Sequence, residues 1–309
     1  MPKTDVRFID LFSGMGGIRL GFEQAFKKVG YNTKCVLTSE IKESAIKAHE
    51  LNFPGEVLKG DITKINTEDI EDFDFLLAGF PCQAFSVAGK QRGFADTRGT
   101  LFFEVERILR DKKPYGFILE NVEGLVTHDK ENTSDTIGRT LSTIIHSLET
   151  MGYQVSWKVL DAKNFGLAQT RNRIYIVGTL KEKISLDDFK KKSISFGRIQ
   201  ENGLPTVDDA FTQALLEIYQ PQELYGKSIK DKRGGENNIH SWELGIRGQT
   251  TVAEKNLLNR LLKERRKKHW AEVIGIDWMD GMPLTVEQIR TFYDSDQLED
   301  ILQHLLDMG

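Results

Sequence analysis

One cysteine of the chain stands in a setting that suits a nucleophile. Cys82 follows Pro81, and the stretch around it contains Gly79, Gly89 and Gly93. Proline fixes the backbone where it enters the loop, and a cationic setting lowers the pKa of a thiol so that the reactive thiolate forms. A small buried cysteine is the common alternative. Polar and basic neighbours argue against burial: Gln83, Ser86, Lys90, Gln91 and Arg92.

A carboxylic acid follows another apolar segment, in Leu119-Glu120-Asn121-Val122. A carboxyl group in a closed pocket can be protonated and can donate a hydrogen bond to a ring nitrogen. Alone, Glu120 is one acid among many. Together with Cys82 it would form a chemical unit of a nucleophile and an acid.

Two arginines, Arg171 and Arg173, are separated by one residue in an expected strand. Side chains at this spacing point to the same face of a strand. They could form a double anchor for a carboxylate or a phosphate. A solvated strand face explains the pair about equally well.

The segment from Phe8 to Gly17 is expected to run from a strand through a glycine-rich turn into a helix. Gly14, Gly16 and Gly17 would let a ligand approach the backbone, and a helix N-terminus favours a carboxylate or phosphate. The dinucleotide fingerprint fails because position 19 is Arg, and no phosphate loop follows. The segment is therefore either a turn that holds the amino acid end of a ligand or a plain tight turn.

Two acids follow expected strand ends. Glu40 could accept hydrogen bonds from both hydroxyl groups of a ribose. Asp61 could accept one from an adenine amino group, with Ile62 against the ring. Both acids could instead be helix-capping or turn residues, which are common.

Composition limits the class of protein. The 309 residues are 39% hydrophobic and 28% charged, which is typical of a soluble globular chain, and the net charge of −4 does not exclude a local basic cleft. The two cysteines, Cys35 and Cys82, favour a reducing compartment. The six histidines are scattered, so no metal site is expected. Neither a signal peptide nor a membrane-spanning run is apparent, and a cytoplasmic protein is expected.

Short apolar runs alternate with amphipathic stretches through the first 180 residues. This alternation predicts an α/β fold with a mostly parallel sheet and helices on both faces. In such sheets ligands bind beyond the carboxyl ends of the strands, and we place every motif above just after a strand. The expected strands are residues 7–12, 35–38, 73–77, 116–119, 155–160 and 173–177, and the expected helices are residues 17–29, 42–51, 100–110 and 136–151.

The alternation of apolar runs and amphipathic stretches ends after about residue 180. We expect one domain over residues 1–185 and a second region over residues 186–309. Residues 250–270 have a helical pattern with a basic end, and residues 284–289 and 298–306 predict two short helices. Residues 250–309 would suit the helical part of a winged-helix module, with Arg265, Arg266, Lys267 and Lys268 on DNA. A helical insertion that serves only in packing is about equally favoured.

The ordered motifs resemble those of the bacterial cytosine-5 DNA methyltransferases of restriction–modification systems. The resemblance covers roughly residues 6–180. The matching blocks are residues 8–17, Glu40, residues 60–62, 78–94, 98–103, 120–122 and 169–175. It implies a Rossmann-like, S-adenosylmethionine-dependent methyltransferase fold, followed by a smaller target-recognition region.

The resemblance also implies roles for individual residues. Cys82 would attack C6 of a flipped-out cytosine, Glu120 would act at N3, and Arg171 and Arg173 would hold the catalytic groups and the target nucleotide. Duplex DNA would be the partner, contacted by Gln83, Ser86, Lys90 and Arg92, and the cofactor would be S-adenosylmethionine without a metal. The expected pocket for that cofactor is formed by Phe12, Gly14, Gly16, Gly17, Glu40, Asp61, Ile62, Pro81 and Leu101. Ile41 stands where the family commonly has an aromatic residue.

Two further family blocks are not found after residue 180. One is an arginine-rich block with a Leu-Thr core, and the other begins a terminal helix that completes the donor pocket. We therefore expect this chain to be weak or inactive alone, with a second polypeptide or a missing C-terminal segment completing the pocket. An RNA cytosine-5 methyltransferase and a silent DNA-binding relic are the alternatives. A bacterial, nucleoid-associated protein is expected.

Overall fold

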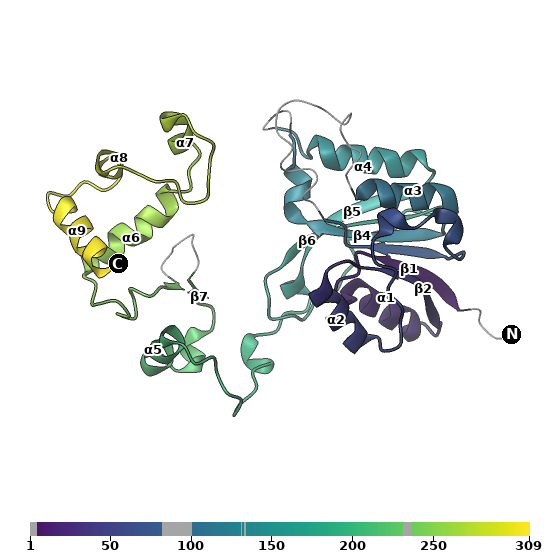
Figure 1. Ribbon diagram of the computed structural model, residues 1–309, viewed down its shortest axis with the longest axis horizontal. Coiled ribbons are helices and arrows are strands. Elements are labelled where there is room, and N and C mark those ends of the chain that lie inside the picture. The colour runs from purple at the N-terminus through teal and green to yellow at the C-terminus, as the bar shows by residue number, and fades with distance from the viewer. Residues whose placement is uncertain (1–4, 82–100, 131, 133, 231–236) are drawn as a thin grey trace. The chain divides into compact units, whose positions relative to one another are not determined.

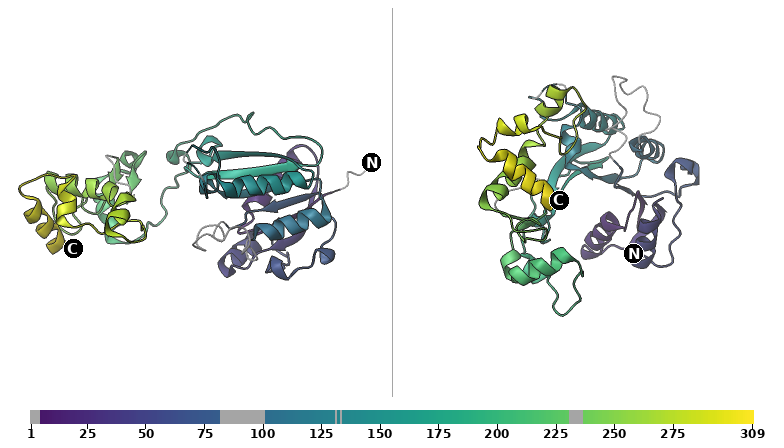
Figure 2. Two further views of the ribbon diagram at one scale, coloured as in Figure 1. Left: turned by 90° about the horizontal axis from the view of Figure 1, so that it is seen from above. Right: turned by 60° about the vertical axis from the view of Figure 1, so that its left-hand side comes forward.

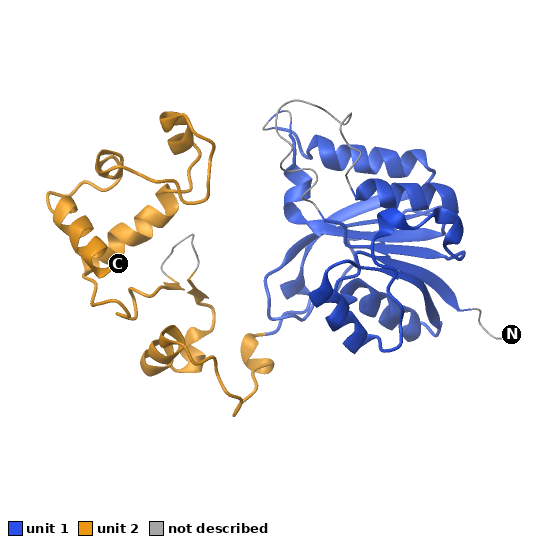
Figure 3. Ribbon diagram, in the orientation of Figure 1, with its two compact units in different colours: residues 1–194 blue, residues 195–309 orange. Residues whose placement is uncertain are grey.

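The computed structural model describes residues 5–81, 101–130, 132, 134–230 and 237–309. The chain divides into two compact units, Met1–Ile194 and Ser195–Gly309 (Figure 3). The division falls somewhat later than the expected boundary near residue 185.

Unit 1 is built on a six-stranded sheet with the strand order β2-β1-β3-β4-β6-β5. Strands β1 to β4 run parallel, whereas β6 runs antiparallel to both β4 and β5. The strands are β1 (Val6–Leu11), β2 (Thr33–Ser39), β3 (Phe75–Ala78), β4 (Gly116–Val122), β5 (Gln154–Asp161) and β6 (Asn172–Thr179). The prediction of a mostly parallel sheet is confirmed.

Helices cover both faces of this sheet, as Figure 1 and the view from above in Figure 2 show. One face carries α1 (Gly17–Lys28) and α2 (Glu43–Asn52), and the other carries α3 (Phe102–Lys112) and α4 (Arg139–Thr150). Short 3-10 helices occur at η1 (Ile62–Lys64), η2 (Thr67–Asp69), η5 (Glu123–Thr127) and η6 (Ala162–Asn164).

The side-chain pattern explains the two layers. On α4, Leu141, Ile144 and Leu148 recur at helical spacing and are fully or almost fully buried, so the helix has one apolar stripe. On the opposite face, Phe22 of α1 packs with its ring centroid 5.0 Å from that of Phe8 and 4.6 Å from that of Phe26. The predicted fold class is confirmed by both layers.

The charged segment after β6 is tied back onto unit 1. The N–H of Gly166 donates to the carbonyl of Lys192 at 2.6 Å, and the N–H of Lys192 donates to the carbonyl of Asn164 at 2.7 Å. Thr179 Oγ1 donates to the carbonyl of Glu182 at 2.7 Å. These hydrogen bonds tie residues up to Lys192 to unit 1, which agrees with its end at Ile194, past the expected boundary.

Unit 2 is mainly helical. Its elements are η7 (Phe196–Arg198), α5 (Ala210–Ile218), η8 (Pro221–Leu224), β7 (Ser228–Ile229), β8 (Asn238–Ile239), α6 (Val252–Glu264), α7 (His269–Ile274), α8 (Val286–Arg290) and α9 (Leu298–Met308). Leu257, Ile289, Leu298 and Ile301 form a core between α6, α8 and α9. The helices expected near residues 250–270, 284–289 and 298–306 are thus present, the first of them divided into α6 and α7.

The basic end of α6 is held inside unit 2. Arg265 donates from Nε to the carbonyl of Met282 at 2.9 Å and from Nη2 to that of Gly281 at 2.8 Å. Arg266 Nε lies 3.0 Å from Asp280 Oδ1. Lys267 Nζ lies 2.7 Å from an oxygen of Glu264. These pairings favour the packing interpretation of this segment, and the winged-helix hypothesis stays a prediction.

No helix in the described ranges is both long and apolar enough to cross a membrane.

Candidate active site

Glu120 and Arg173 form an ion pair between neighbouring strands. In the register of β4 and β6, Glu120 lies opposite Tyr175 and Val122 lies opposite Arg173. Arg173 Nε lies 2.9 Å from Glu120 Oε1, and each side chain is 22% exposed. Partial burial weakens the competition of water, so this contact fixes the direction of the carboxylate more firmly than a surface pair would.

The antiparallel direction of β6 brings Arg173 to this place. We expected each motif to follow a strand, but Arg173 lies at the beginning of β6, and Arg171 precedes it. Because β6 runs against β4, its first residues lie beside the last residues of β4. Arg171 is exposed and its N–H donates to Asp161 Oδ1 at 2.9 Å. The structure therefore brings Arg173 to Glu120 and gives Arg171 a backbone contact with β5.

Gly79 lies against the second oxygen of Glu120. A Cβ atom on Gly79 would lie 3.6 Å from Glu120 Oε2. The stretch that leads to the predicted nucleophile therefore approaches the side of the carboxylate that Arg173 does not occupy. Cys82 itself lies outside the described residues, as do Gln83, Ser86, Lys90 and Arg92. Pro81, the last described residue before them, is exposed.

Asn121 connects β4 to the same stretch. Its side chain is 3% exposed, and Nδ2 donates to the carbonyl of Phe80 at 2.9 Å. Its Oδ1 accepts from the N–H of Val122 at 2.8 Å. Replacing a buried amide whose nitrogen and oxygen both form hydrogen bonds costs stability, because their partners are left without a bond. The sequence analysis quoted this residue without assigning it a role, although a polar side chain on the inward face of a buried strand was the available signal.

The glycine-rich turn has a backbone that only certain residues tolerate. Phe12, Gly14 and Gly16 have φ values of 54°, 56° and 82°. A Cβ atom on Gly16 would lie 2.2 Å from a ring carbon of Phe53. Glycine is required at position 16 by both the backbone angle and the close ring. A Cβ on Gly14 or Gly17 would meet no atom within 4 Å, so space is open beside both of these residues.

Glu40 holds the turn to the start of α2. Its Oε2 accepts from the N–H of Gly14 at 2.8 Å. Its Oε1 accepts from the N–H groups of Ile41 and Lys42, each at 2.8 Å. A carboxylate has about four acceptor positions, so one remains for a further donor. The predicted contact with a ribose stays a prediction.

Asp61 acts as a helix cap. Its Oδ1 accepts from the N–H of Thr63 at 3.0 Å and from Thr63 Oγ1 at 2.8 Å, at the N-terminus of η1. These hydrogen bonds lower the pKa of Asp61. Ile62 is 2% exposed and belongs to the core of unit 1. The capping alternative thus describes Asp61 in this structure, and contacts of Asp61 and Ile62 with an adenine stay predictions. Leu101 is half-buried at the N-terminus of α3.

Unpartnered buried atoms lie at the turn. Ser13 Oγ and Asp10 Oδ2 are both buried and have no hydrogen-bond partner. A buried polar atom without a partner costs free energy unless a ligand or a water molecule satisfies it. With the open space at Gly14 and Gly17, Ser13 Oγ fits a turn that receives a polar ligand. In the sequence, Ser13 gave no signal beyond its place among the glycines.

A charged network lies beneath the turn, on the α1 side of the sheet. Arg19 bonds to Glu23 at 2.8 Å and also to Glu56, which lies 3.4 Å from His49 Nε2. Asp10 is 1% exposed. Burial raises its pKa to about 7, although the charge of Arg19 acts in the opposite direction. This network was not anticipated from the sequence. A carboxylate between two apolar residues, Ile9 and Leu11, near the end of a strand was the signal.

The comparisons with known proteins agree with this geometry. A family model described as C-5 cytosine-specific DNA methylase matches residues 6–296. The chain belongs to this family. It is therefore a DNA cytosine-5 methyltransferase, and the family, the activity and the fold class expected from the sequence are confirmed.

Individual relatives support the assignment. The chain is 61% identical over 304 residues to the Type II methyltransferase M.NlaIV of Neisseria lactamica, covering 98% of this chain and 72% of the relative. It is 60% identical, with the same coverage, to the Type II methyltransferase M.NgoBV of Neisseria gonorrhoeae. A solved structure of a Spodoptera frugiperda DNMT2 mutant matches 98% of this chain and 99% of its own, with a TM-score of 0.54 and 17% identity. At that identity the structural match supports the fold alone.

No group of three or more metal-ligating side chains occurs among the residues that the structure describes.

The turn generates a prediction about stability. Gly16→Ala should lower the free energy of unfolding by about 2–4 kcal/mol, because alanine is strained at this φ and its Cβ overlaps Phe53. Gly17→Ala is the matched control. Its Cβ meets open space at the first residue of α1, so stability should stay equal or rise by up to about 1 kcal/mol. Urea unfolding of both variants measures this. Equal effects of the two substitutions would contradict the described turn.

The buried acid generates a prediction about pH. Because the folded-state pKa of Asp10 lies near 7 and its ordinary value is 3.8, the folded state keeps its proton while the unfolded state loses it. Stability should therefore fall as the pH rises from about 4 to about 7, by at most roughly 4 kcal/mol from this group. Asp10→Asn should be more stable than wild type, and the gap in stability should widen from about pH 4 to about pH 7 and stay constant above that. Asp111→Asn, at an exposed position on α3, is the control and should show no such widening in urea unfolding. A constant gap for Asp10→Asn would contradict the burial argument.

Proposed function

We propose that the chain methylates C5 of a flipped-out cytosine within a specific duplex DNA sequence, as the modification enzyme of a Type II restriction–modification system. The relatives with about 60% identity are named Type II methyltransferases. The observation that carries the proposal at the level of residues is the Glu120–Arg173 pair beside Gly79, three residues before Cys82.

S-adenosylmethionine would bind at the glycine-rich turn. The open space at Gly14 and Gly17, the unpartnered Ser13 Oγ and the remaining acceptor position of Glu40 fit such a ligand. Phe12, Gly16, Asp61, Ile62, Pro81 and Leu101 complete the proposed pocket. When bound, this cofactor supplies an electrophilic methyl group to C5 of the cytosine.

Cys82 and Glu120 would divide the chemistry on the ring. The Cys82 thiolate adds to C6 and forms an S–C6 bond, while the electron pair of the C5–C6 double bond makes C5 nucleophilic. After methylation, a base removes the C5 proton, the double bond returns and the S–C6 bond breaks to release the thiolate. Glu120 would hydrogen-bond to N3 and stabilise the proton there during the addition.

Arg173 would decide which oxygen of Glu120 serves the ring. Its Nε occupies Oε1, so Oε2, which faces Gly79, is the oxygen available to N3. Asn121 would hold the backbone at Phe80, so that the approach to Cys82 keeps its place beside the carboxylate. Arg171 would contact the target nucleotide, and Gln83, Ser86, Lys90 and Arg92 would contact the DNA. Flipping the base out of the duplex costs a few kcal/mol, which these contacts must offset.

The proposal includes a contribution to the donor pocket from outside this polypeptide. The matched relatives are longer than the region they share with this chain, which is 72% of their length. Completion of the donor pocket by a second polypeptide or a further segment, and weak activity of the chain alone, remain predictions. The location of the protein in the bacterial cytoplasm, near the nucleoid, also remains a prediction. The comparisons do not favour the RNA methyltransferase or the silent relic.

Covalent trapping of the protein on DNA tests the proposal. It needs only one turnover for each protein molecule, so it can also detect a slow enzyme. On DNA that contains 5-fluorocytosine, fluorine at C5 cannot leave as a proton, so Cys82 should remain bonded to C6 once the methyl group has been transferred. Stoichiometric chain with S-adenosylmethionine should give a band of protein–DNA adduct that survives denaturation. Cys82→Ser should abolish the band, and Cys35→Ser, at a cysteine in β2, is the matched control and should retain it.

Two outcomes would contradict the proposed function. One is an adduct that persists in Cys82→Ser. The other is an adduct formed on fluorinated RNA and not on fluorinated duplex DNA, which would favour the RNA alternative.

A further inference from the structure

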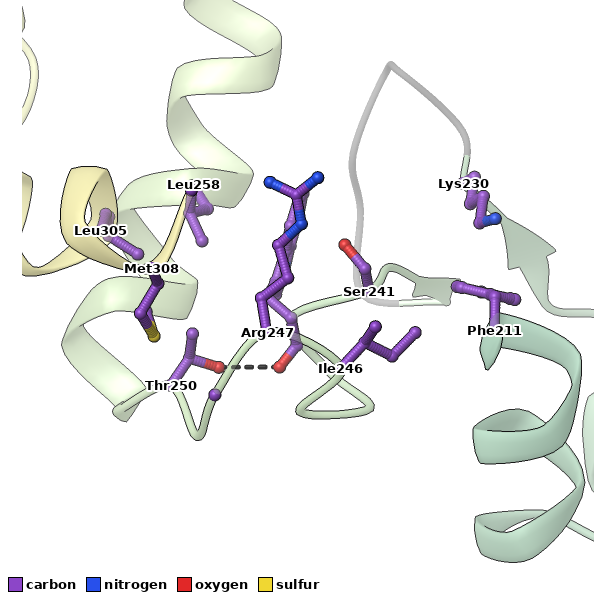
Figure 4. Close-up of a pocket in the computed structure, with 12 residues that line it drawn as sticks. Phe211, Lys230, Ser241, Ile246, Arg247, Thr250, Leu258, Leu305 and Met308 are labelled. Carbon is purple, nitrogen blue, oxygen red and sulfur yellow. Dashed lines mark hydrogen bonds between the residues drawn. The ribbon is translucent and has the colours of Figure 1, made fainter. Parts of the chain in front are cut away.

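Unit 2 contains a cavity of about 490 Å³ (Figure 4). Its apolar walls include Phe211 from α5, Leu258 from α6 and Leu305 from α9. Its polar groups include Lys230, Ser241 and Arg247. The lining residues include two cations and no aspartate or glutamate. The two positive charges favour an anionic group over a cation at this cavity.

The guanidinium of Arg247 is available to a ligand. Its side chain is exposed, and within the described part of the chain its guanidinium has neither a hydrogen bond nor a carboxylate partner. Arg265 and Arg266 of the same unit are both bound to carbonyl or carboxylate oxygens. Five N–H donors of Arg247 are therefore available to a ligand.

The loop that carries Arg247 is held in place. Thr250 Oγ1 donates to the carbonyl of Trp242 at 2.8 Å, which closes the loop (Figure 4). A Cβ atom on Gly248 would lie 2.8 Å from the sulfur of Met308, so the loop packs closely on the end of α9. In Figure 4 the Arg247 side chain extends between Leu258 and Ser241. A fixed loop lowers the entropy that Arg247 loses when it binds a ligand.

Lys230 supplies a second positive charge to the lining. Its Nζ lies 3.8 Å from the centre of the Phe211 ring. Its charge contributes to the lowered pKa of Asp209, but hydrogen bonds from Thr212 to that carboxylate are the larger cause. Asp209 is not part of the cavity lining. The side chains that line the cavity therefore carry two positive charges and no negative one, on a chain whose net charge is −4.

We propose that this cavity binds a phosphate group of the DNA backbone, with Arg247 donating to the phosphate oxygens and Lys230 adding charge. The proposal rests on the proposed function, in which duplex DNA is the substrate. Phosphate contacts fix the position of a protein on the duplex and carry no sequence information directly. Arg247 would thus position unit 2 on DNA of any sequence.

Salt-dependent DNA binding by the whole chain tests this assignment. Arg247→Gln should weaken binding about tenfold at roughly 0.1 M salt, for a duplex that the chain methylates and for one that it does not. The slope of log affinity against log salt should become shallower by about 1, as expected for one lost phosphate contact. Arg247→Lys should retain most of the slope. Arg260→Gln, at an exposed position on α6 outside the lining, is the matched control and should behave as wild type.

Several results would overturn the inference. Arg247→Gln could bind both duplexes as the control does. It could lose affinity only for the duplex whose sequence the chain methylates, which would indicate a contact with a base. It could leave binding unchanged and lower the melting temperature, which would indicate that Arg247 only stabilises the C-terminal end of α9. Failure of the wild-type chain to bind either duplex would count against the proposed function as well, so the two failures are distinguishable.

Discussion

The contact between Glu120 and Arg173 depends on a single topological feature, the antiparallel strand β6 inserted between β4 and β5. A fully parallel sheet would carry the first residues of β6 to the opposite edge, far from the end of β4. With β6 reversed, Arg173 lies 2.9 Å from Glu120 and directs one carboxylate oxygen toward Gly79. Both Glu120 and the stretch from Gly79 to Phe80 are thereby held at the end of β4.

The glycine-rich turn and the stretch beside Glu120 are held in place by the same kind of hydrogen bond. A carboxylate or amide on one element holds the backbone of another: Glu40 accepts from Gly14, and Asn121 donates to the carbonyl of Phe80. Each contact joins segments that are distant in sequence and adjacent in the sheet. The rigid sheet therefore positions two loops, and only glycine at position 16 allows the first of them to form.

Much of this fold could be predicted from the sequence because alternating apolar segments and amphipathic helices report burial directly. The family could be identified because its motifs occur in order. The reversal of β6 could not be predicted, since residues 172–179 show the same apolar alternation whichever way the strand runs. The capping role of Asp61 was one of the two alternatives that the sequence offered. The network around Asp10 and Arg19 and the cavity at Arg247 could not be predicted. Each depends on contacts between residues far apart in the chain, which periodicity does not encode.

The central claim is that Arg173 acts through Glu120, and a double-mutant cycle measures this directly. The rate of adduct formation on fluorinated duplex DNA would be compared for wild type, Glu120→Gln, Arg173→Met and the double variant. If Arg173 serves only to orient Glu120, the double variant should be no slower than Glu120→Gln alone. If the two losses multiply, the residues act independently, and the account of the ion pair given above is contradicted.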